Sequence, residues 1–228
     1  MKNPYFRSIL GAAMSVAVFA ASAADSSRPV AGTLSIGTTG VGAHLTIPLA
    51  KDFHGRVGYN GFSYNYDGNT DNSDYTFKLR LKTIDGLIDY YPTASAFRVT
   101  AGLIYNGSDV TTVAKPRAGN LYTFQGRTYS AATAGQINGK ADFRKSAPYL
   151  GIGTGNALVT QGLSFTADLG VAFIGKPQTS LALANCTAGT LVCNQLANDL
   201  VAENNSLQDK LNDFRFYPVV RVGISYRF

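Results

Sequence analysis

The segment Val220-Arg-Val-Gly-Ile-Ser-Tyr-Arg-Phe228 alternates apolar and polar residues without a break. In an extended strand, successive side chains point to opposite faces. One face of this strand is therefore polar, and the other consists of Val220, Val222, Ile224, Tyr226 and Phe228. A strand of a soluble sandwich can show the same alternation. The segment by itself thus predicts a strand with one apolar face and leaves the surroundings of that face open.

The same two-residue period recurs along the chain. Leu163, Phe165 and Leu169 share one face of their segment, while Thr166 and Asp168 share the other. Strands of this kind suit a wall with lipid on one side and a polar interior on the other. Eight strands are predicted, at 28–38, 41–49, 54–66, 74–91, 95–112, 142–155, 161–175 and 213–228.

The connections between these segments alternate in length. Residues 50–53, 92–94 and 156–160 form short connections, whereas 67–73, 113–141 and 176–212 are long. Bacterial membrane barrels have short turns at one end and long loops at the other. We therefore predict an all-β fold, a closed antiparallel transmembrane barrel of about eight strands. This scheme needs a first strand at 28–38 and a tight turn at Thr39-Gly40; the alternative is a strand within 118–135.

Folding the hairpins about their turns predicts registers and irregularities. Residue pairs that share a face are set side by side: Tyr90 with Phe97, Asp89 with Arg98, Ile152 with Phe165, and Tyr149 with Asp168. The alternation shifts at Asn60-Gly61, which predicts a β-bulge. A similar shift between Leu81 and Ile84 indicates either a second bulge or a strand that continues above the membrane.

The N-terminus has the pattern of an export signal. Lys2 and Arg7 precede an apolar run at 9–20, and Ala21-Ser22-Ala23 is a small-residue cleavage site. A run of about 12 residues is shorter than the ~20 that a membrane-spanning helix needs. We expect cleavage after Ala23, which leaves a single barrel domain at 24–228. Removal of Lys2 and Arg7 lowers the formal net charge from +6 to +4, too small an excess to indicate nucleic-acid binding.

The last long connection contains two cysteines and a different periodicity. Cys186 and Cys193 are seven positions apart, and an oxidising compartment favours a local disulfide between them. From 195 to 213, Leu196, Leu200 and Leu207 recur at helical spacing, which predicts a short amphipathic helix. Three roles for this helix remain open: packing outside against the barrel rim, plugging the barrel mouth, or binding a partner.

Charged residues gather at positions expected to face the barrel interior. The interior of an eight-stranded barrel is just wide enough for side chains to fill it, and buried charges need partners. We therefore favour a structural ion-pair plug over a catalytic or conducting lumen. Its predicted members are Lys82, Asp85, Asp89, Arg98, Asp168, Arg221 and Arg227, with His44 and Arg56 nearer the start of the chain.

The sequence offers little for catalysis. His44 and His54 are the two histidines, and neither lies in a motif typical of an outer-membrane hydrolase, acyltransferase or protease. Gly151-Ile-Gly-Thr-Gly155 superficially resembles a phosphate-binding loop, but a strand follows it where such a loop needs a helix. Small residues facing a crowded interior explain it better. We expect no catalytic residue, metal or cofactor.

The connection before the sixth predicted strand is strongly basic. It carries six cations with Asp142 as the single acid, namely Lys115, Arg117, Arg127, Lys140, Arg144 and Lys145. At the outer leaflet these side chains would face lipopolysaccharide phosphates, which form charge-assisted hydrogen bonds with basic groups. The alternative is that the charges keep the loop solvated.

The C-terminal strand, with Tyr226 and the final Phe228, resembles that of Gram-negative outer-membrane barrels, in which the terminal Phe is part of the signal read by the insertion machinery. The whole pattern resembles the small eight-stranded proteins of the OmpA-type transmembrane domain, OmpX and OmpW general class, and no motif assigns a subfamily. This resemblance implies an outer-membrane location and contacts with lipid, lipopolysaccharide and the insertion machinery. The function expected from it is structural or surface-interacting, toward lipopolysaccharide, a host or another cell. The alternatives are a narrow channel for small solutes and, less favoured, a lipid-modifying enzyme.

Overall fold

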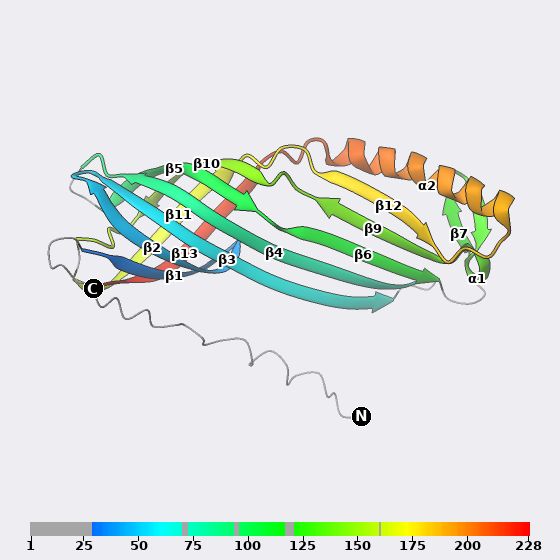
Figure 1. Cartoon of the computed structure of the whole chain (residues 1–228), viewed down its shortest axis with the longest axis horizontal. Helices are drawn as coiled ribbons and strands as arrows, with labels where there is room; N and C mark the ends of the chain where they lie inside the picture. The colour runs from blue at the N-terminus through cyan, green and yellow to red at the C-terminus, as the bar shows by residue number, and fades with distance from the viewer. Residues whose placement is uncertain (1–28, 70–72, 94–95, 117–120, 160) are drawn as a thin grey trace, which may run out of the picture.

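The structure is a computed structural model that describes residues 29–69, 73–93, 96–116, 121–159 and 161–228. The predicted signal peptide at 1–23 and Arg117 of the basic loop lie outside the described residues. Figure 1 shows a barrel at one end of the molecule and a long sheet that leaves it toward the other end, with a helix lying along that sheet. Phe228 lies at the barrel end.

Eight strands of the described chain close into an antiparallel barrel. They follow one another in the order β1, β2, β3, β4, β5, β10, β11 and β13, and β13 pairs with β1. The predicted fold class is therefore confirmed. Their bounds are β1 (Ala31–Gly37), β2 (Gly40–Ala50), β3 (Phe53–Asn69), β4 (Ser73–Tyr90), β5 (Phe97–Asn106), β10 (Ser146–Thr154), β11 (Gly162–Ala172) and β13 (Tyr217–Arg227).

The first strand lies where the connection lengths require it. β1 pairs with β2 on one side and with β13 on the other, so it closes the barrel. The turn between β1 and β2 is tight, and Gly40 follows it with a φ of +98°, a conformation that glycine adopts without strain. The alternative segment at 118–135 contributes a small separate hairpin, β7 (Leu121–Phe124) with β8 (Arg127–Ser130), and the four-residue helix α1 (Ala131–Ala134).

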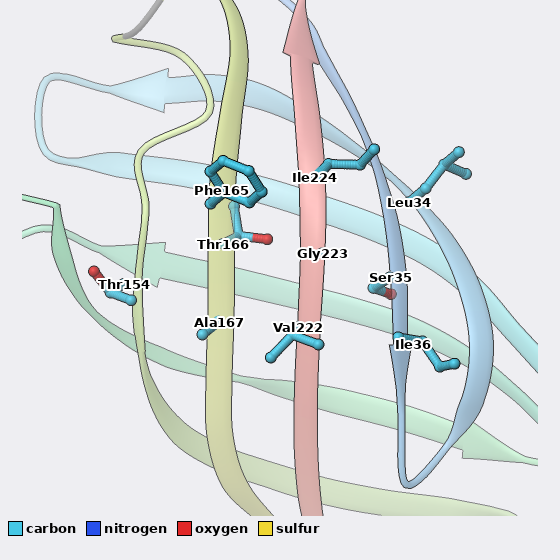
Figure 2. Close-up of a pocket in the computed structure, with 10 residues that line it drawn as sticks. All are labelled: Leu34, Ser35, Ile36, Thr154, Phe165, Thr166, Ala167, Val222, Gly223 and Ile224. Atoms are coloured by element: carbon cyan, nitrogen blue, oxygen red, sulfur yellow. The ribbon is translucent and has the colours of Figure 1, made fainter.

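The outer wall of the barrel is apolar. Figure 2 shows the side chains of Leu34, Phe165 and Ile224 on neighbouring strands β1, β11 and β13. Phe165 is 83% exposed, whereas Ser225, the neighbour of Ile224, points inward and is 1% exposed. A shallow open groove runs between these side chains, with a volume of about 590 Å³. The alternation in the sequence thus separates an apolar outside from a polar inside.

The strand β4 is longer than the barrel wall. Its second half, Thr83–Tyr90, pairs with β5, while Ser73–Arg80 pairs with β6 (Asp109–Pro116). β6 pairs with β9 (Gln136–Asp142), which pairs with β12 (Gln178–Ala184). We call these three strands, together with the ends of β3 and β4 that project beyond the barrel, the extension. The end of the barrel that bears the extension is its upper end, or mouth, and the end with the short turns is its lower end.

The extension corrects three sequence-based expectations. The predicted strand at 95–112 is two strands, which are separated at Gly107-Ser108. The expected long loops at 113–141 and 176–212 contain β9 and β12. These strands are short, and their partners are distant in sequence. The alternation of apolar and polar residues within these short segments therefore predicts the strands poorly, because they are stabilised by the pairing that starts from the projecting half of β4.

The strand registers keep the predicted faces but differ in their partners. Tyr90 lies opposite Val99 instead of Phe97, and Ile152 lies opposite Leu169 instead of Phe165. Shifts of two and four residues leave every side chain on its predicted face, because the side-chain period is two. The face pattern alone therefore could not fix the register.

The two predicted bulges are absent from the pairing of β3 with β4. The register runs without a shift from Phe53 opposite Tyr90 to Asn69 opposite Asp74. Between Leu81 and Ile84 the second expectation, a strand that continues, agrees with the structure, because β4 runs on beyond the barrel. Above the barrel the inner face no longer lines a narrow lumen, so Phe62 and Tyr64 fit on it. A register irregularity does occur between Pro48 and Ala50 in β2.

The predicted helix is α2 (Thr190–Leu211), and it lies along the extension, outside the barrel mouth. The disulfide between Cys186 and Cys193 joins its first turn to the preceding loop, as predicted. Leu196 and Leu200 are fully buried in a cluster with Tyr122, Tyr129 and Ile137. In the described part of the chain, no helix is long and apolar enough to cross a membrane.

Candidate functional site

Two arginines and two aspartates fill the lower lumen. Arg56 donates to both carboxylate oxygens of Asp168, at 2.9 and 3.1 Å, and to Asp89 at 3.1 Å. Arg98 donates to Asp168 at 2.7 Å, and its Nε lies 3.7 Å from Asp89. Thr100 donates a further hydrogen bond to Asp89 at 2.5 Å. These four charged side chains come from β3, β4, β5 and β11, so their ion pairs connect these strands across the lumen.

A second layer lies directly above the first. Asp85 is completely buried and contacts three side chains: His44 at 3.0 Å, Asn60 at 2.9 Å and Arg221 at 2.8 Å. Arg221 also donates from Nε to Thr39 at 3.0 Å. We call the two layers together the plug. Its members are Arg56, Asp89, Arg98, Thr100, Asp168, His44, Asn60, Asp85 and Arg221.

Glycines make room for the plug. A Cβ at Gly58 would lie 2.0 Å from the ring of His44, and one at Gly153 would lie 2.9 Å from both Arg98 and Asp168. A Cβ at Gly151 would meet the hydroxyl of Tyr149 at 2.4 Å. Gly151 and Gly153 belong to the glycine-rich stretch at 151–155. In the structure, this stretch gives the lumen side chains the space that they need.

Two residues assigned to the lumen charges lie elsewhere. Lys82 is exposed on the outer face of β4, because its inward placement together with Asp85 would require the bulge that is absent. Arg227 lies at the lower end of the barrel, where it donates to the carbonyls of Leu158 and Val159. It is close to the turn after β10 and is not part of the plug.

The histidines are enclosed by other side chains. His44 is 5% exposed, and its hydrogen-bond partner Asp85 is 0% exposed. His54 is buried at the lower end, with its ring 4.7 Å from that of Tyr91. A histidine next to a carboxylate is a familiar catalytic arrangement, but here the pair is sealed within the plug. Among the described residues, no group of three His, Cys, Asp or Glu side chains could hold a metal ion.

An apolar cavity of about 360 Å³ lies above the plug, in the mouth of the barrel; we call it the cup. Leu81, Ile104 and Tyr217 line it from the strands β4, β5 and β13, and Phe143 lines it from the connection between β9 and β10. Thr39 and Thr83 belong both to its lining and to the hydrogen bonds of the plug beneath. Sequence reasoning missed the cup. A signal was present, since Leu79 and Leu81 continue the inward face of Thr83 as apolar residues.

The six residues of the predicted basic loop do not form one patch. Arg127 pairs with Asp199 of α2 at 2.7 Å, and Lys140 pairs with Asp142 at 2.8 Å. Arg144 and Lys145 are exposed at the barrel rim. They line a hollow of about 810 Å³ together with Lys140, Asp142, Asp109 and Lys176. Lys115 is in the extension strand β6, and Arg117 lies outside the described residues.

Solved structures resemble this closed barrel and its projecting sheet. The fold is similar to that of CarO from Acinetobacter baumannii. The structure of CarO matches with a TM-score of 0.56 and 22% sequence identity, and that of CarO2 from the same organism with 0.54 and 18%. Each comparison covers 88% of this chain and 98% of the solved one. No protein-family model matches the sequence, and neither does any curated protein. At this level of identity the likeness to CarO shows the fold alone.

Proposed function

We propose that the protein is an integral outer-membrane barrel with a non-conducting lumen, exported by its N-terminal signal, whose rim contacts lipopolysaccharide. The observation that carries this proposal is the plug, which fills the lumen with buried, mutually paired charges. A solute crossing the barrel would have to separate Asp168 from Arg56 and Arg98. Breaking such buried pairs is strongly unfavourable.

The outer wall supports the membrane location. Leu163 on β11 and Phe173, the residue after its end, are ten positions apart. At about 3.3 Å per residue and a tilt of about 40°, they span a height of about 25 Å, which is that of an outer-membrane apolar band. Aromatic pairs lie at both ends of the wall, as in the girdles of such barrels. Phe173 packs against Phe216 at the rim, and Phe53 against Tyr90 at the lower end.

The rim supports the contact with lipopolysaccharide. Arg144, Lys145 and Lys176 line a hollow there in which Asp109 and Asp142 are the acids. Because Asp142 is paired with Lys140, the hollow retains an excess of positive charge. Phosphate groups at the outer leaflet would be stabilised by this excess through charge-assisted hydrogen bonds.

Two measurements test the proposal. Purified protein in planar bilayers should show no discrete conductance, and stable single-channel steps would overturn the closed lumen and favour the narrow channel. Binding to lipopolysaccharide vesicles should weaken severalfold in a variant with Arg144→Glu and Lys145→Glu, and it should weaken further as salt is raised. Lys51→Glu, at an exposed turn of the opposite end, is the matched control. Equal binding by both variants would refute the rim contact.

A further inference from the structure

The cup has the properties of a small-molecule site. Its volume of about 360 Å³ is near the lower end of the range for ligand cavities, roughly 300 to 1,000 Å³. The plug closes it below, and Phe143 and Tyr217 border it above. Its lining is almost entirely apolar, with a few hydroxyl and amide groups. This is the composition of a site that encloses an apolar molecule and orients it with a small number of polar contacts.

Hydroxyl groups at the bottom of the cup are placed to donate. Thr39 accepts a hydrogen bond from Arg221, and Thr83 accepts one from Asn60. Each hydroxyl oxygen accepts one hydrogen bond with one of its two lone pairs and keeps its proton, which it can donate to an acceptor inside the cup. A ligand oxygen at this level would accept a hydrogen bond from either hydroxyl, and only one lone pair on each hydroxyl oxygen remains for a ligand donor.

The charges beneath the cup favour an uncharged ligand. The plug holds three arginines, Arg56, Arg98 and Arg221, and three aspartates, Asp85, Asp89 and Asp168. The formal charges of these six side chains balance. A ligand carboxylate or ammonium would lose its hydration in an apolar cavity without gaining an uncompensated counter-charge.

We propose that the cup binds one small, uncharged, mostly apolar molecule, with an oxygen that accepts a hydrogen bond from Thr39 or Thr83. This binding does not depend on the contact with lipopolysaccharide. Phe143 borders both the cup and the rim hollow, but none of the basic side chains of the hollow lines the cup. It concerns a binding site above a closed floor, so the molecule enters and leaves through the mouth.

The test uses 2-octanone and octanoate, which are similar in apolar length but differ in charge. The protein is placed in lipid nanodiscs with labelled Ile, Leu and Val methyl groups, and shifts are followed by NMR. With 2-octanone, saturable shifts are expected at Leu81, Ile104 and Val110 in the cup. The outward-facing Leu103 and Val222 should show the smaller, non-saturating changes that follow from partition into lipid.

Three variants locate the binding. Ala172→Phe fills the cup from the wall and should abolish the saturable shifts, whereas Ala101→Phe, on the outward face of β5, should leave them unchanged. Thr83→Val should lower the affinity for 2-octanone roughly three- to tenfold, as expected for one lost hydrogen bond. That variant removes the bond from Asn60 to Thr83, but Asn60 keeps its bond to Asp85 and the ion pairs of the plug are unchanged.

Each part of the proposed site can be overturned by a separate result. Absence of saturable shifts, or their survival in Ala172→Phe, would overturn the site. Equal or tighter binding of octanoate would overturn the preference for an uncharged ligand. That result would identify Arg221, whose Nη2 has no hydrogen-bond acceptor in the structure, as the recognising group. Unchanged affinity in Thr83→Val, together with unchanged affinity in Thr39→Val, would overturn the role of the hydroxyls.

Discussion

Replacing Asp168 by asparagine should severely destabilise the barrel. Asp168 is buried and accepts three hydrogen bonds, two from Arg56 and one from Arg98. Asp168→Asn removes the negative charge but keeps the shape of the side chain. Two buried guanidinium groups then share Asp89 alone, which lies 3.1 Å from Arg56 and 3.7 Å from Arg98.

The expected loss follows from this geometry. Removing one partner of a buried ion pair costs about 3–5 kcal/mol, and two arginines lose a partner here, so the free energy of unfolding should fall by at least about 3 kcal/mol. A loss of that size lowers the equilibrium constant for folding more than a hundredfold, since about 1.4 kcal/mol corresponds to a factor of ten. Reversible urea unfolding in lipid vesicles, followed by far-UV circular dichroism, measures it.

The control for this experiment is Asp142→Asn. Asp142 also pairs with a cation, Lys140 at 2.8 Å, but both side chains are about half exposed. An exposed pair contributes about 0–1 kcal/mol, so the control should unfold nearly as the wild type does. If Asp168→Asn loses less than about 1 kcal/mol and cannot be distinguished from the control, the plug does not stabilise the barrel, and our account of the lumen is wrong.

Three further predictions concern other parts of the molecule. Gly153→Ala places a methyl group 2.8 Å from the carbonyl of Ala167 and against the plug, so it should cost about 1–3 kcal/mol in the same unfolding assay. Gly86→Ala should not, because its Cβ would lie 4.0 Å from the nearest atom, the carbonyl oxygen of Leu103. Replacing Cys186 and Cys193 by serine should lower the free energy of amide-exchange protection of α2 by about 2–3 kcal/mol, because the disulfide closes a short loop at the start of the helix. The protection of β11 should be unchanged, and an equal loss in both elements would contradict this prediction. The hydrogen bond from Tyr129 holds the pKa of Asp199 below its ordinary value of about 3.9. This carboxylate therefore stabilises the docking of α2 at any pH above about 3.9, and its contribution is lost as the pH falls below that value. Exchange protection of α2 should therefore decrease below that pH, and Asp199→Asn should remove the dependence; a variant that keeps it would refute the role of Asp199.

The sequence predicted the faces of the strands better than their partners. The alternation in 220–228 identified the outward and inward residues of β13 correctly, because lipid and lumen impose opposite polarity on neighbouring positions. The partners of Tyr90 and Ile152 were wrong, since a shift by an even number of residues changes no face. The turn geometry that selects between such registers is not visible in the alternation.

The candidate site was partly visible in the sequence. Asp85, Asp89, Arg98, Asp168 and Arg221 were placed inside by their alternation, and the structure brings them together. Lys82 was misplaced, because it and Asp85 can both point inward only if a bulge lies between them, whereas the strand has an unbroken register there. The apolar inward residues Leu79 and Leu81 were the signal for the cup in the sequence. Its full lining could not be predicted, since it combines β4, β5, β6, β10, β11 and β13 with Phe143 from the connection that follows β9.

The course of β4 has a mechanical consequence. One uninterrupted backbone carries hydrogen-bond ladders to β5 in the barrel and to β6 in the extension, and the register of β3 beside it is also unbroken. No flexible joint therefore separates the two parts along these strands. A force applied to the extension would therefore be transmitted along β3 and β4 directly into the wall of the barrel.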